Sequence, residues 1–435
     1  MTTAPIGSGT ESTVPSGQPT DTAPATVADQ APTTGERRLL TGLMANSVAL
    51  YAVYGAVPAV LLPNLVADID PGSKSTSLGV ISAVGAFGAM LANPVAGALS
   101  DRTHGRFGRR APWMAGGALL GGLSLIALGL GNNLLWIGVA WALAQISLNG
   151  LQAPLTAVIP DRTPEHRRGV FSSAAGLAQM LGATLGAAAA AGFAHALGLG
   201  FAAFGVLVVI GTAVYLLLNK EPAAPAPQGE VFRWKAFLAG FWVSPRKHPD
   251  FGWAFLGRFL LVLGYYCVAS YQLYILDDYL GLTRDHANHL VPLLSLSMLP
   301  GLIVMIVVSG PWSDRVGRRK PFVIASSLGM AGALALPLVL HSVASMFGYA
   351  VLSGCAFGMY MAVDTALMTQ VLPRPDAAAK DMGVLNVANA LPQALAPAVA
   401  AVVIGALGGY SALFVAGILL TVLGALSILP IRTVR

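Results

Sequence analysis

Charge is scarce in this sequence of 435 residues. It holds 25 lysines and arginines and 19 aspartates and glutamates, which is 10% of the chain, whereas soluble domains carry about 25%. Because so few charged side chains cannot cover a soluble protein of this size, their scarcity excludes a soluble globular enzyme. The hydrophobic fraction of 55% and the mean hydropathy of +0.69 indicate a helical protein that crosses a membrane several times.

Cysteines and the common catalytic motifs are also rare or missing. Cys267 and Cys355 both lie in apolar runs, so the sequence excludes a disulfide scaffold and a zinc pattern, and we expect no disulfide. There is no G-x-x-x-x-G-K-[ST] loop for ATP, no H-E-x-x-H and no G-x-S-x-G. We therefore expect no enzyme activity, no cofactor and no metal ion. The basic residues form no contiguous surface, so a nucleic-acid partner is not expected.

The sequence does contain twelve apolar runs, each close to or above the length of about 20 residues that spans a bilayer. They predict an all-α polytopic membrane protein with twelve transmembrane helices. Glycines such as Gly182 and Gly186 lie inside the runs, where small residues let neighbouring helices approach closely. The runs cover residues 39–66, 76–99, 112–131, 134–159, 169–194, 198–218, 251–276, 288–309, 321–341, 345–372, 382–406 and 409–430.

Polar segments divide the chain into four parts. Residues 1–36 are rich in Thr, Pro and Ser and contain no basic residue, so they predict a disordered cytoplasmic tail. The longest polar interruption, 219–250, separates two halves of six runs each, 37–218 and 251–435. Within it, residues 231–238 mix bulky apolar and basic side chains, which fits either a short amphipathic helix on the membrane surface or a plain linker.

The positions of the basic residues predict how the chain is oriented. With the amino terminus inside, Lys74 and Arg284 fall on outer loops and Arg258 falls within a span, while the other 22 lie at the inner face. This bias follows the positive-inside rule with both termini cytoplasmic. Since no organelle signal is present, we expect the protein in a bacterial cell membrane.

A repeated loop signature marks the two halves. The loop after the second run, residues 97–112, reads GALSDRTHGRFGRRAP, and the loop after the eighth, residues 310–321, reads GPWSDRVGRRKP. Their aspartates are 213 residues apart, as are Pro160 and Pro373, which end the fourth and tenth runs. A parallel repeat of six-helix units indicates a transporter built from two pseudo-symmetric bundles.

With these two loops the chain resembles the major facilitator superfamily, whose signature is G-x-x-x-D-R-x-G-R-R. The resemblance covers about residues 38–432, and the first copy has three extra residues. Finer features resemble the glycoside/sucrose-type cation symporters, including residues 380–393, KDMGVLNVANALPQ. The fifth run lacks the Gly-Pro pair that is usual in drug–proton antiporters, which disfavours export. The resemblance implies a fold that opens to each side of the membrane in turn.

The signature loops predict a cytoplasmic gate. Their aspartates can accept hydrogen bonds from arginines or from the start of a facing helix. Such contacts would close the inner side and break when it opens. Acids after the fourth run are expected to pair with the arginines of the first signature. The predicted gate residues are Gly97, Asp101, Arg102, Arg109, Arg110, Asp161, Arg168, Gly310, Asp314, Arg315, Arg318 and Arg319.

Two charges lie deep within the runs, Arg258 in the seventh and Asp364 in the tenth. Each is about eight residues, or about 12 Å, from the cytoplasmic end of its run, and the resemblance implies that both helices line one cavity. We therefore expect the two side chains to meet. Three roles are open. The two charges could form a permanent ion pair that only neutralises them. Asp364 could exchange a proton and couple transport to the proton gradient, or Arg258 could bind an anionic group of the solute.

Polar side chains recur at helical spacing in several runs. Amides and tyrosines offer hydrogen bonds to hydroxyl groups, and aromatic faces stack on sugar rings, so we expect these residues to line the solute cavity; bridging between helices is the alternative. The predicted cavity residues are Tyr51, Tyr54, Trp141, Gln145, Asn149, Gln152, Tyr265, Gln272, Asn386, Asn389 and Gln393.

These features favour a monomeric secondary transporter that takes up a small polyhydroxylated, sugar-like solute together with protons. Two alternatives stay open from the sequence. The protein could export drugs or metabolites against protons, or it could be a membrane sensor or scaffold that transports nothing. Loss of the buried charges and polar stripes would favour the last, and here both are present.

Overall fold

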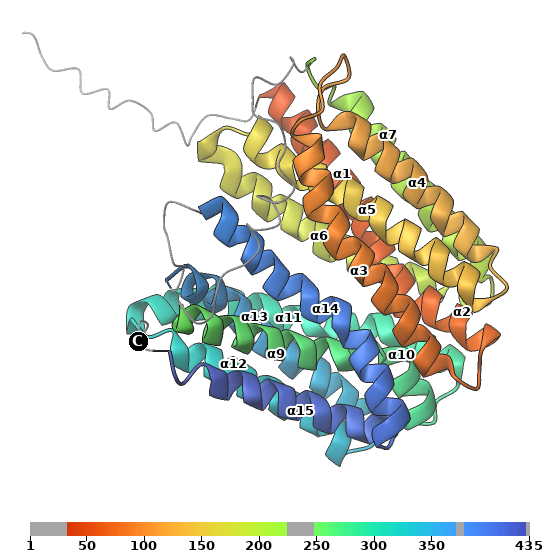
Figure 1. The fold of residues 1–435 in the computed structure, drawn as a ribbon, viewed down its shortest axis with the longest axis vertical. Coiled ribbons are helices and arrows are strands. Elements are labelled where there is room, and N and C mark those ends of the chain that lie inside the picture. Colours follow the sequence, from red (N-terminus) through yellow and green to blue (C-terminus); the bar gives the residue numbers. More distant parts are fainter. Residues whose placement is uncertain (1–32, 224–247, 371–377, 432–435) are drawn as a thin grey trace, which may run out of the picture.

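The computed structural model describes residues 33–223, 248–370 and 378–431, apart from the side chains of 365, 366, 368–370 and 378–386. All regular structure in this part of the chain is helical (Figure 1). The first half contains α1 (Thr34–Ala56), which continues through the π-helix η2 (Val57–Leu61) into α2 (Leu62–Ile69), then α3 (Lys74–Ser100), α4 (Ala111–Gly129), α5 (Leu134–Arg162), the short η3 (Glu165–Arg167), α6 (Arg168–Ala191) and α7 (Leu197–Leu218). The second half contains α9 (Pro249–Ala269), α10 (Gln272–Tyr274), the π-helix η4 (Ile275–Tyr279), α11 (Arg284–Val316), α12 (Lys320–Val339), α13 (Val343–Gln370), α14 (Ala378–Leu407) and α15 (Gly409–Ser427).

The described residues form twelve spans long and apolar enough to cross a membrane, which confirms the predicted fold class. The seventh run differs from its prediction, because α9 ends at Ala269 and the chain continues through a turn into α10 and η4. The first helix begins at Thr34, so residues 34–36 were wrongly assigned to the tail. Thr33 and Glu36 form a capping box there, which satisfies free N–H groups at the helix start. Residues 1–32, and the possible amphipathic helix at 231–238, lie outside the described residues.

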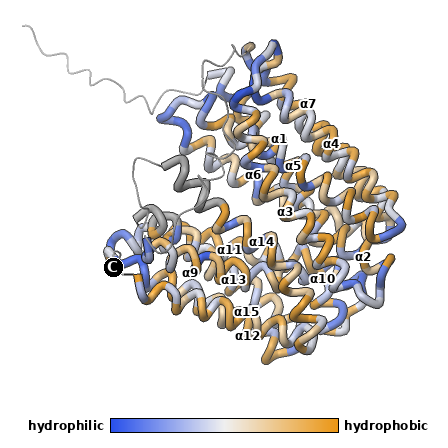
Figure 2. Tube along the Cα trace, viewed as in Figure 1, coloured by the Kyte–Doolittle hydropathy of each residue, from blue (hydrophilic) through white to orange (hydrophobic). Residues whose placement is uncertain are grey.

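The flanks of both bundles are apolar. Large side chains such as Leu119, Leu120 and Leu123 on α4 are more than half exposed, and hydrophilic residues gather at the helix ends (Figure 2). Exposing such a large apolar surface to water would be unfavourable, whereas the hydrocarbon chains of a bilayer can surround it.

The two halves pack in the same way. In the first half, α1 packs against α6, α3 against α5, and α4 against α7; in the second half, α9 packs against α14, α11 against α13, and α12 against α15. Glycine permits the closest approaches, as the sequence predicted. A Cβ atom at Gly186 on α6 would lie 2.1 Å from the carbonyl oxygen of Ala52 on α1, and one at Gly354 on α13 would lie 2.2 Å from that of Met298 on α11.

The halves contact each other unevenly along their length. We name the two ends of the helical bundles by their loops. The basic end carries the loops 101–110, 162–168 and 316–320. The far end carries the loops 70–73, 130–133, 192–196, 270–283 and 340–342. Between the halves, α3 packs against α14, and α6 packs against α11. The bundles meet at the far end, near α2 and α10, and spread apart toward the basic end (Figure 1).

Candidate functional site

The structure brings the two buried charges of the second half together. Nη1 of Arg258 on α9 lies 3.1 Å from Oδ2 of Asp364 on α13, and the side chains are only 14% and 5% exposed. Among the described residues, Asp364 is the only acidic side chain that is fully buried. Each charge therefore depends on the other for neutralisation, because an unpaired charge at this depth would be costly.

Polar atoms around this pair remain without partners. Nε of Arg258 and the hydroxyl of Tyr360 are buried and make no hydrogen bond to any residue that the structure describes. Tyr360 lies one helical turn before Asp364 and interacts with it electrostatically, although their geometry is not that of a hydrogen bond. The ring of Phe357 lies 6.1 Å from that of Tyr360 between centroids and stacks on Tyr265 at 5.2 Å. The pair therefore lies in an aromatic setting whose polar atoms have hydrogen-bonding capacity to spare.

Three predicted cavity residues of the first half form one cluster. Nε2 of Gln152 on α5 donates to the Tyr51 hydroxyl at 2.9 Å, and the Tyr54 hydroxyl donates to Oε1 of Gln152 at 3.2 Å. The two tyrosine rings meet edge to face, with centroids 5.5 Å apart. The amide thus ties α5 to α1, and all three side chains are half-buried.

The other predicted residues of α5 lie in different surroundings. Asn149 accepts a weak hydrogen bond of 3.5 Å from Asn93 on α3 and donates to the carbonyl of Gln145 at 2.9 Å. Trp141 is 2% exposed, and a Cβ atom at Gly85 on α3 would lie 2.5 Å from its indole nitrogen. Its ring therefore fills the contact between α5 and α3. Oε1 of Gln145 is buried and has no hydrogen-bond partner within the described part of the chain.

The predicted cavity residues of the second half are more dispersed. The Tyr265 hydroxyl donates to the sulfur of Met298 at 3.3 Å. Gln272, Asn389 and Gln393 are half-buried, and the side chain of Asn386 lies outside the described residues. The structure therefore gathers three of the six first-half residues into a bonded cluster, whereas no hydrogen bond joins the second-half residues to one another among the side chains described.

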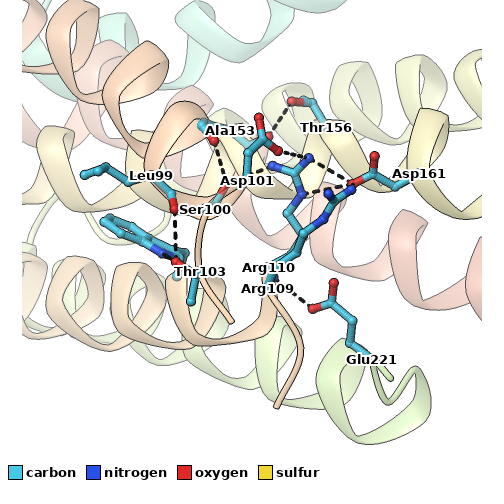
Figure 3. A network of polar contacts seen from close by, with 12 residues as sticks. Leu99, Ser100, Asp101, Thr103, Arg109, Arg110, Ala153, Thr156, Asp161 and Glu221 are labelled. Carbon is cyan, nitrogen blue, oxygen red and sulfur yellow. Dashed lines mark hydrogen bonds and ion pairs between the residues drawn. The ribbon is translucent and has the colours of Figure 1, made fainter. Parts of the chain in front are cut away.

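The first signature loop forms an ionic network around the buried Arg110 at the basic end (Figure 3). Arg110 is 7% exposed; its Nε and Nη2 lie 3.0 and 2.9 Å from Oδ2 of Asp161, and its Nη1 donates to Ser100 at 2.8 Å. Arg110 also pairs with Asp101 at 2.5 Å, and Arg109 pairs with Asp161 at 2.7 Å. The expected pairing with an acid after the fourth run is therefore present, and these contacts lie within one half.

The other gate residues predicted in the first half lie next to this ionic network. Arg168 donates to the carbonyls of Pro160 and Thr163 at 3.1 and 3.3 Å, which satisfies free carbonyls at the end of α5. A Cβ atom at Gly97 would make only an ordinary contact, 4.0 Å from Ala153 of α5, so the approach of α3 to α5 does not require glycine there. Arg102 is exposed.

Glu221, at the start of the linker, belongs to this network although sequence reasoning missed it. Its Oε2 accepts hydrogen bonds from the N–H groups of Arg110 and Ala111 at 2.9 and 3.0 Å and so caps α4. Gly108, with φ of +80°, leaves the space, since a Cβ atom there would lie 2.4 Å from the Glu221 side chain. The signal that could have found it was an acid soon after the sixth run.

The second signature loop is built differently. Asp314 is 69% exposed on its side chain and pairs with Arg319 at 3.2 Å, and Arg315 and Arg318 are exposed. A Cβ atom at Gly310 would meet open space. By the 213-residue repeat, the partner of this loop would come from residues near 374, which lie outside the described residues. No three His, Cys, Asp or Glu side chains gather as a metal site among the residues that the structure describes.

Comparison with known proteins identifies the family. The sequence model of the Major Facilitator Superfamily matches residues 39–303 and 254–434, which together span nearly the whole chain. The chain belongs to the major facilitator superfamily. As a member of this superfamily it is an integral membrane protein, and its duplicated bundles and paired signature loops are those of the family.

Individual relatives match only parts of the chain. It is 29% identical over 173 residues to the MFS transporter asaE of Aspergillus flavus, which is 39% of this chain and 36% of that protein. It is 26% identical over 235 residues to the fujikurins efflux protein of Gibberella fujikuroi, which is 52% of this chain and 46% of that protein. Each match spans less than half of the relative's length.

Solved structures show the same fold at low identity. The nucleoside transporter NupG superposes with a TM-score of 0.72 at 14% identity, covering 91% of this chain and all of that one. A bacterial homologue of the human lysosomal transporter Spinster, in an inward-facing and occupied conformation, superposes with a TM-score of 0.69 at 14% identity, covering 92% and 96%. The glycoside/sucrose-type branch stays a prediction.

Proposed function

We propose that this transporter imports a small polyhydroxylated solute together with protons across a bacterial cell membrane, acting as a monomer. Its basic end faces the cytoplasm in this proposal, because nearly all lysines and arginines lie there. The far end then faces outward. In this orientation the structure would correspond to an inward-facing state, because the helices of the two bundles meet at the far end and diverge toward the basic end (Figure 1).

The observation that carries the proton-coupling proposal is the ion pair between Arg258 and Asp364. It joins α9 and α13 at 3.1 Å in a nearly dry position. In such surroundings the charge of a carboxylate depends strongly on how close its cation lies. A change in the distance between α9 and α13 during the cycle would load Asp364 with a proton on one side of the membrane and release it on the other.

The solute contacts that we propose are the cluster of Tyr51, Tyr54 and Gln152 together with the half-buried amides of α14. Their hydroxyl and amide groups both donate and accept hydrogen bonds. A sugar-like solute presents the same mixture of groups along with apolar ring faces, which the edge-to-face tyrosines can cover. A hydrophobic drug would leave these polar atoms without partners.

Export is the second candidate, and it rests on a specific finding. One curated relative is named an efflux protein. The same ion pair could couple proton entry to solute exit, because alternating access works in either direction. Directional assays separate the two functions.

The deciding experiment uses purified protein in liposomes with an alkaline interior. Wild-type protein is expected to accumulate a sugar or polyol from a screened panel, and a protonophore is expected to abolish the accumulation. The Asp364→Asn variant should still exchange labelled for unlabelled solute but should not accumulate it. Undiminished, pH-dependent accumulation by that variant would remove Asp364 from proton coupling.

A further inference from the structure

Almost all charged side chains at the far end form ion pairs between the two halves. Seven of the described acidic, lysine and arginine residues lie there: Asp68, Asp70, Lys74, Asp277, Asp278, Arg284 and Asp285. All except Asp70 pair with a residue of the opposite half, Asp285 through His195. Of the lysines and arginines that the structure describes, only Lys74 and Arg284 lie at the far end, so both departures from the positive-inside pattern serve contacts between the halves.

Lys74 is the centre of the strongest of these contacts. Its Nζ, at the start of α3, lies 2.9 Å from Oδ2 of Asp277 and 2.7 Å from Oδ1 of Asp278. It also lies 4.9 Å from the centre of the Tyr274 ring. The π-helix η4 presents the two neighbouring carboxylates to one ammonium group. The Tyr410 hydroxyl donates to the other oxygen of Asp278 at 2.7 Å, which holds that carboxylate in place.

Neutral hydrogen bonds between the halves surround this ion pair. The Tyr271 hydroxyl donates to the carbonyl of Ser75 and the Tyr274 hydroxyl to that of Pro63, both at 2.7 Å. Burial raises the pKa of Tyr271 and of Tyr274, so both hydroxyls keep the protons that they donate. Asn64 and Asn288, each at most 2% exposed, exchange amide hydrogen bonds of 2.7 and 3.4 Å.

The other ionic contacts between the halves are more open to water. Arg284 and Asp68 are 37% and 52% exposed on their side chains, and His195 and Asp285 are 82% and 63% exposed. These four residues line a cleft of about 420 Å³. Lys74 is only 15% exposed, and its partners are 22% and 35% exposed. Because solvent and salt weaken exposed pairs most, the Lys74 contact dominates.

We propose that Lys74, held between Asp277 and Asp278, is the latch that keeps the far end closed and sets how often the transporter opens there. The proposal rests on the alternating access proposed above. When the far end opens, α3 moves away from η4, and the ammonium group must leave both carboxylates. Neutralising Lys74 removes an attraction that exists only when the far end is closed and leaves two partly buried carboxylates unpaired at the closed interface, so the open state becomes more populated.

A distance measurement tests the latch without any solute. Spin labels are attached at Leu135→Cys and Leu340→Cys, which are 79% and 55% exposed at the far ends of α5 and α12 in opposite halves. Cys267 and Cys355 are replaced by serine. The label-to-label distance distribution is measured by pulsed electron paramagnetic resonance. The Lys74→Met variant is expected to raise the population at longer distance about fivefold, and Lys74→Arg is expected to keep it near the wild-type level.

Two further variants keep the test decisive. The double variant Asp277→Asn, Asp278→Asn should produce the same shift, which guards against misfolding of one variant. Asp70→Asn is the matched control, because the Asp70 carboxylate accepts hydrogen bonds from Ser73 and Ser77 of its own half, and it should leave the distances unchanged. Wild-type distances in both latch variants would overturn the proposal. Shifted distances in a protein that moves no solute would instead refute transport and leave the latch intact.

Discussion

Breaking the ion pair between Arg258 and Asp364 is expected to weaken the fold as well as transport. Removing one partner of a buried pair costs about 3–5 kcal/mol, and the remaining exposure of 14% and 5% places this pair near the lower figure. The Arg258→Met variant should therefore lose about 3 kcal/mol of stability. Since domains of about 150–250 residues lose about 2–4 °C of Tm for each kcal/mol, the expected fall in Tm is about 6–12 °C.

The double variant Arg258→Met, Asp364→Asn separates structural from coupling roles. With both charges removed, neither is left buried and unpaired, so Tm should return to within a few degrees of wild type. Tm is followed by intrinsic tryptophan fluorescence in detergent, and transport by solute accumulation in liposomes. If the pair couples protons, the double variant recovers stability but not accumulation. Full recovery of proton-driven accumulation would show that the pair has only a structural role. Single variants as stable as wild type would refute the predicted loss of stability.

Three other substitutions have expected outcomes. Gly186→Leu should lower Tm by at least several degrees, because its side chain would meet the α1 backbone at a position where even a Cβ atom lies 2.1 Å from a carbonyl oxygen. Gly108→Ala should expel the carboxylate of Glu221 from the start of α4 and make the linker more sensitive to brief proteolysis. Gln152→Leu should raise the half-saturating solute concentration about tenfold with less change in maximal rate, because the hydroxyls of the two α1 tyrosines lose their amide partner.

Each of these has a matched control in the same chain. Gly176 lies on the same helix as Gly186 with open space around it, so Gly176→Leu should be tolerated. Gly317→Ala imposes similar backbone strain, at φ of +65°, with no neighbour to displace. Thr156→Val removes a hydroxyl of α5 that bonds only its own helix among the described residues and should leave solute affinity unchanged. Equal effects in target and control would contradict the assigned contact.

The helices could be predicted from the sequence because a bilayer fixes the length of each apolar run. The meeting of Arg258 and Asp364 could be predicted for a related reason, since two isolated charges at equal depth each need a partner. The break after Ala269 could not be predicted. It places Tyr274 against the carbonyl of Pro63 in the other half, and a contact between segments so distant in sequence has no local signal.

The polar contacts at the two ends were foreseen only in part. Asp161 was expected to meet the arginines because its loop follows the fourth run directly. Glu221 was missed because its role depends on how the linker folds back onto the start of α4. Lys74 was recognised as an exception on an outer loop, but its partners Asp277 and Asp278 are fixed only by how the two halves dock.

Solute-driven proton movement is the most direct test of the proposed function. Liposomes containing the protein are placed in a weakly buffered medium with a pH-sensitive dye, and sugars, polyols and nucleosides are added one at a time. At least one solute is expected to make the medium more alkaline as protons enter with it, and the Asp364→Asn protein should give no such signal. Solute entry without any proton movement would contradict proton-coupled import.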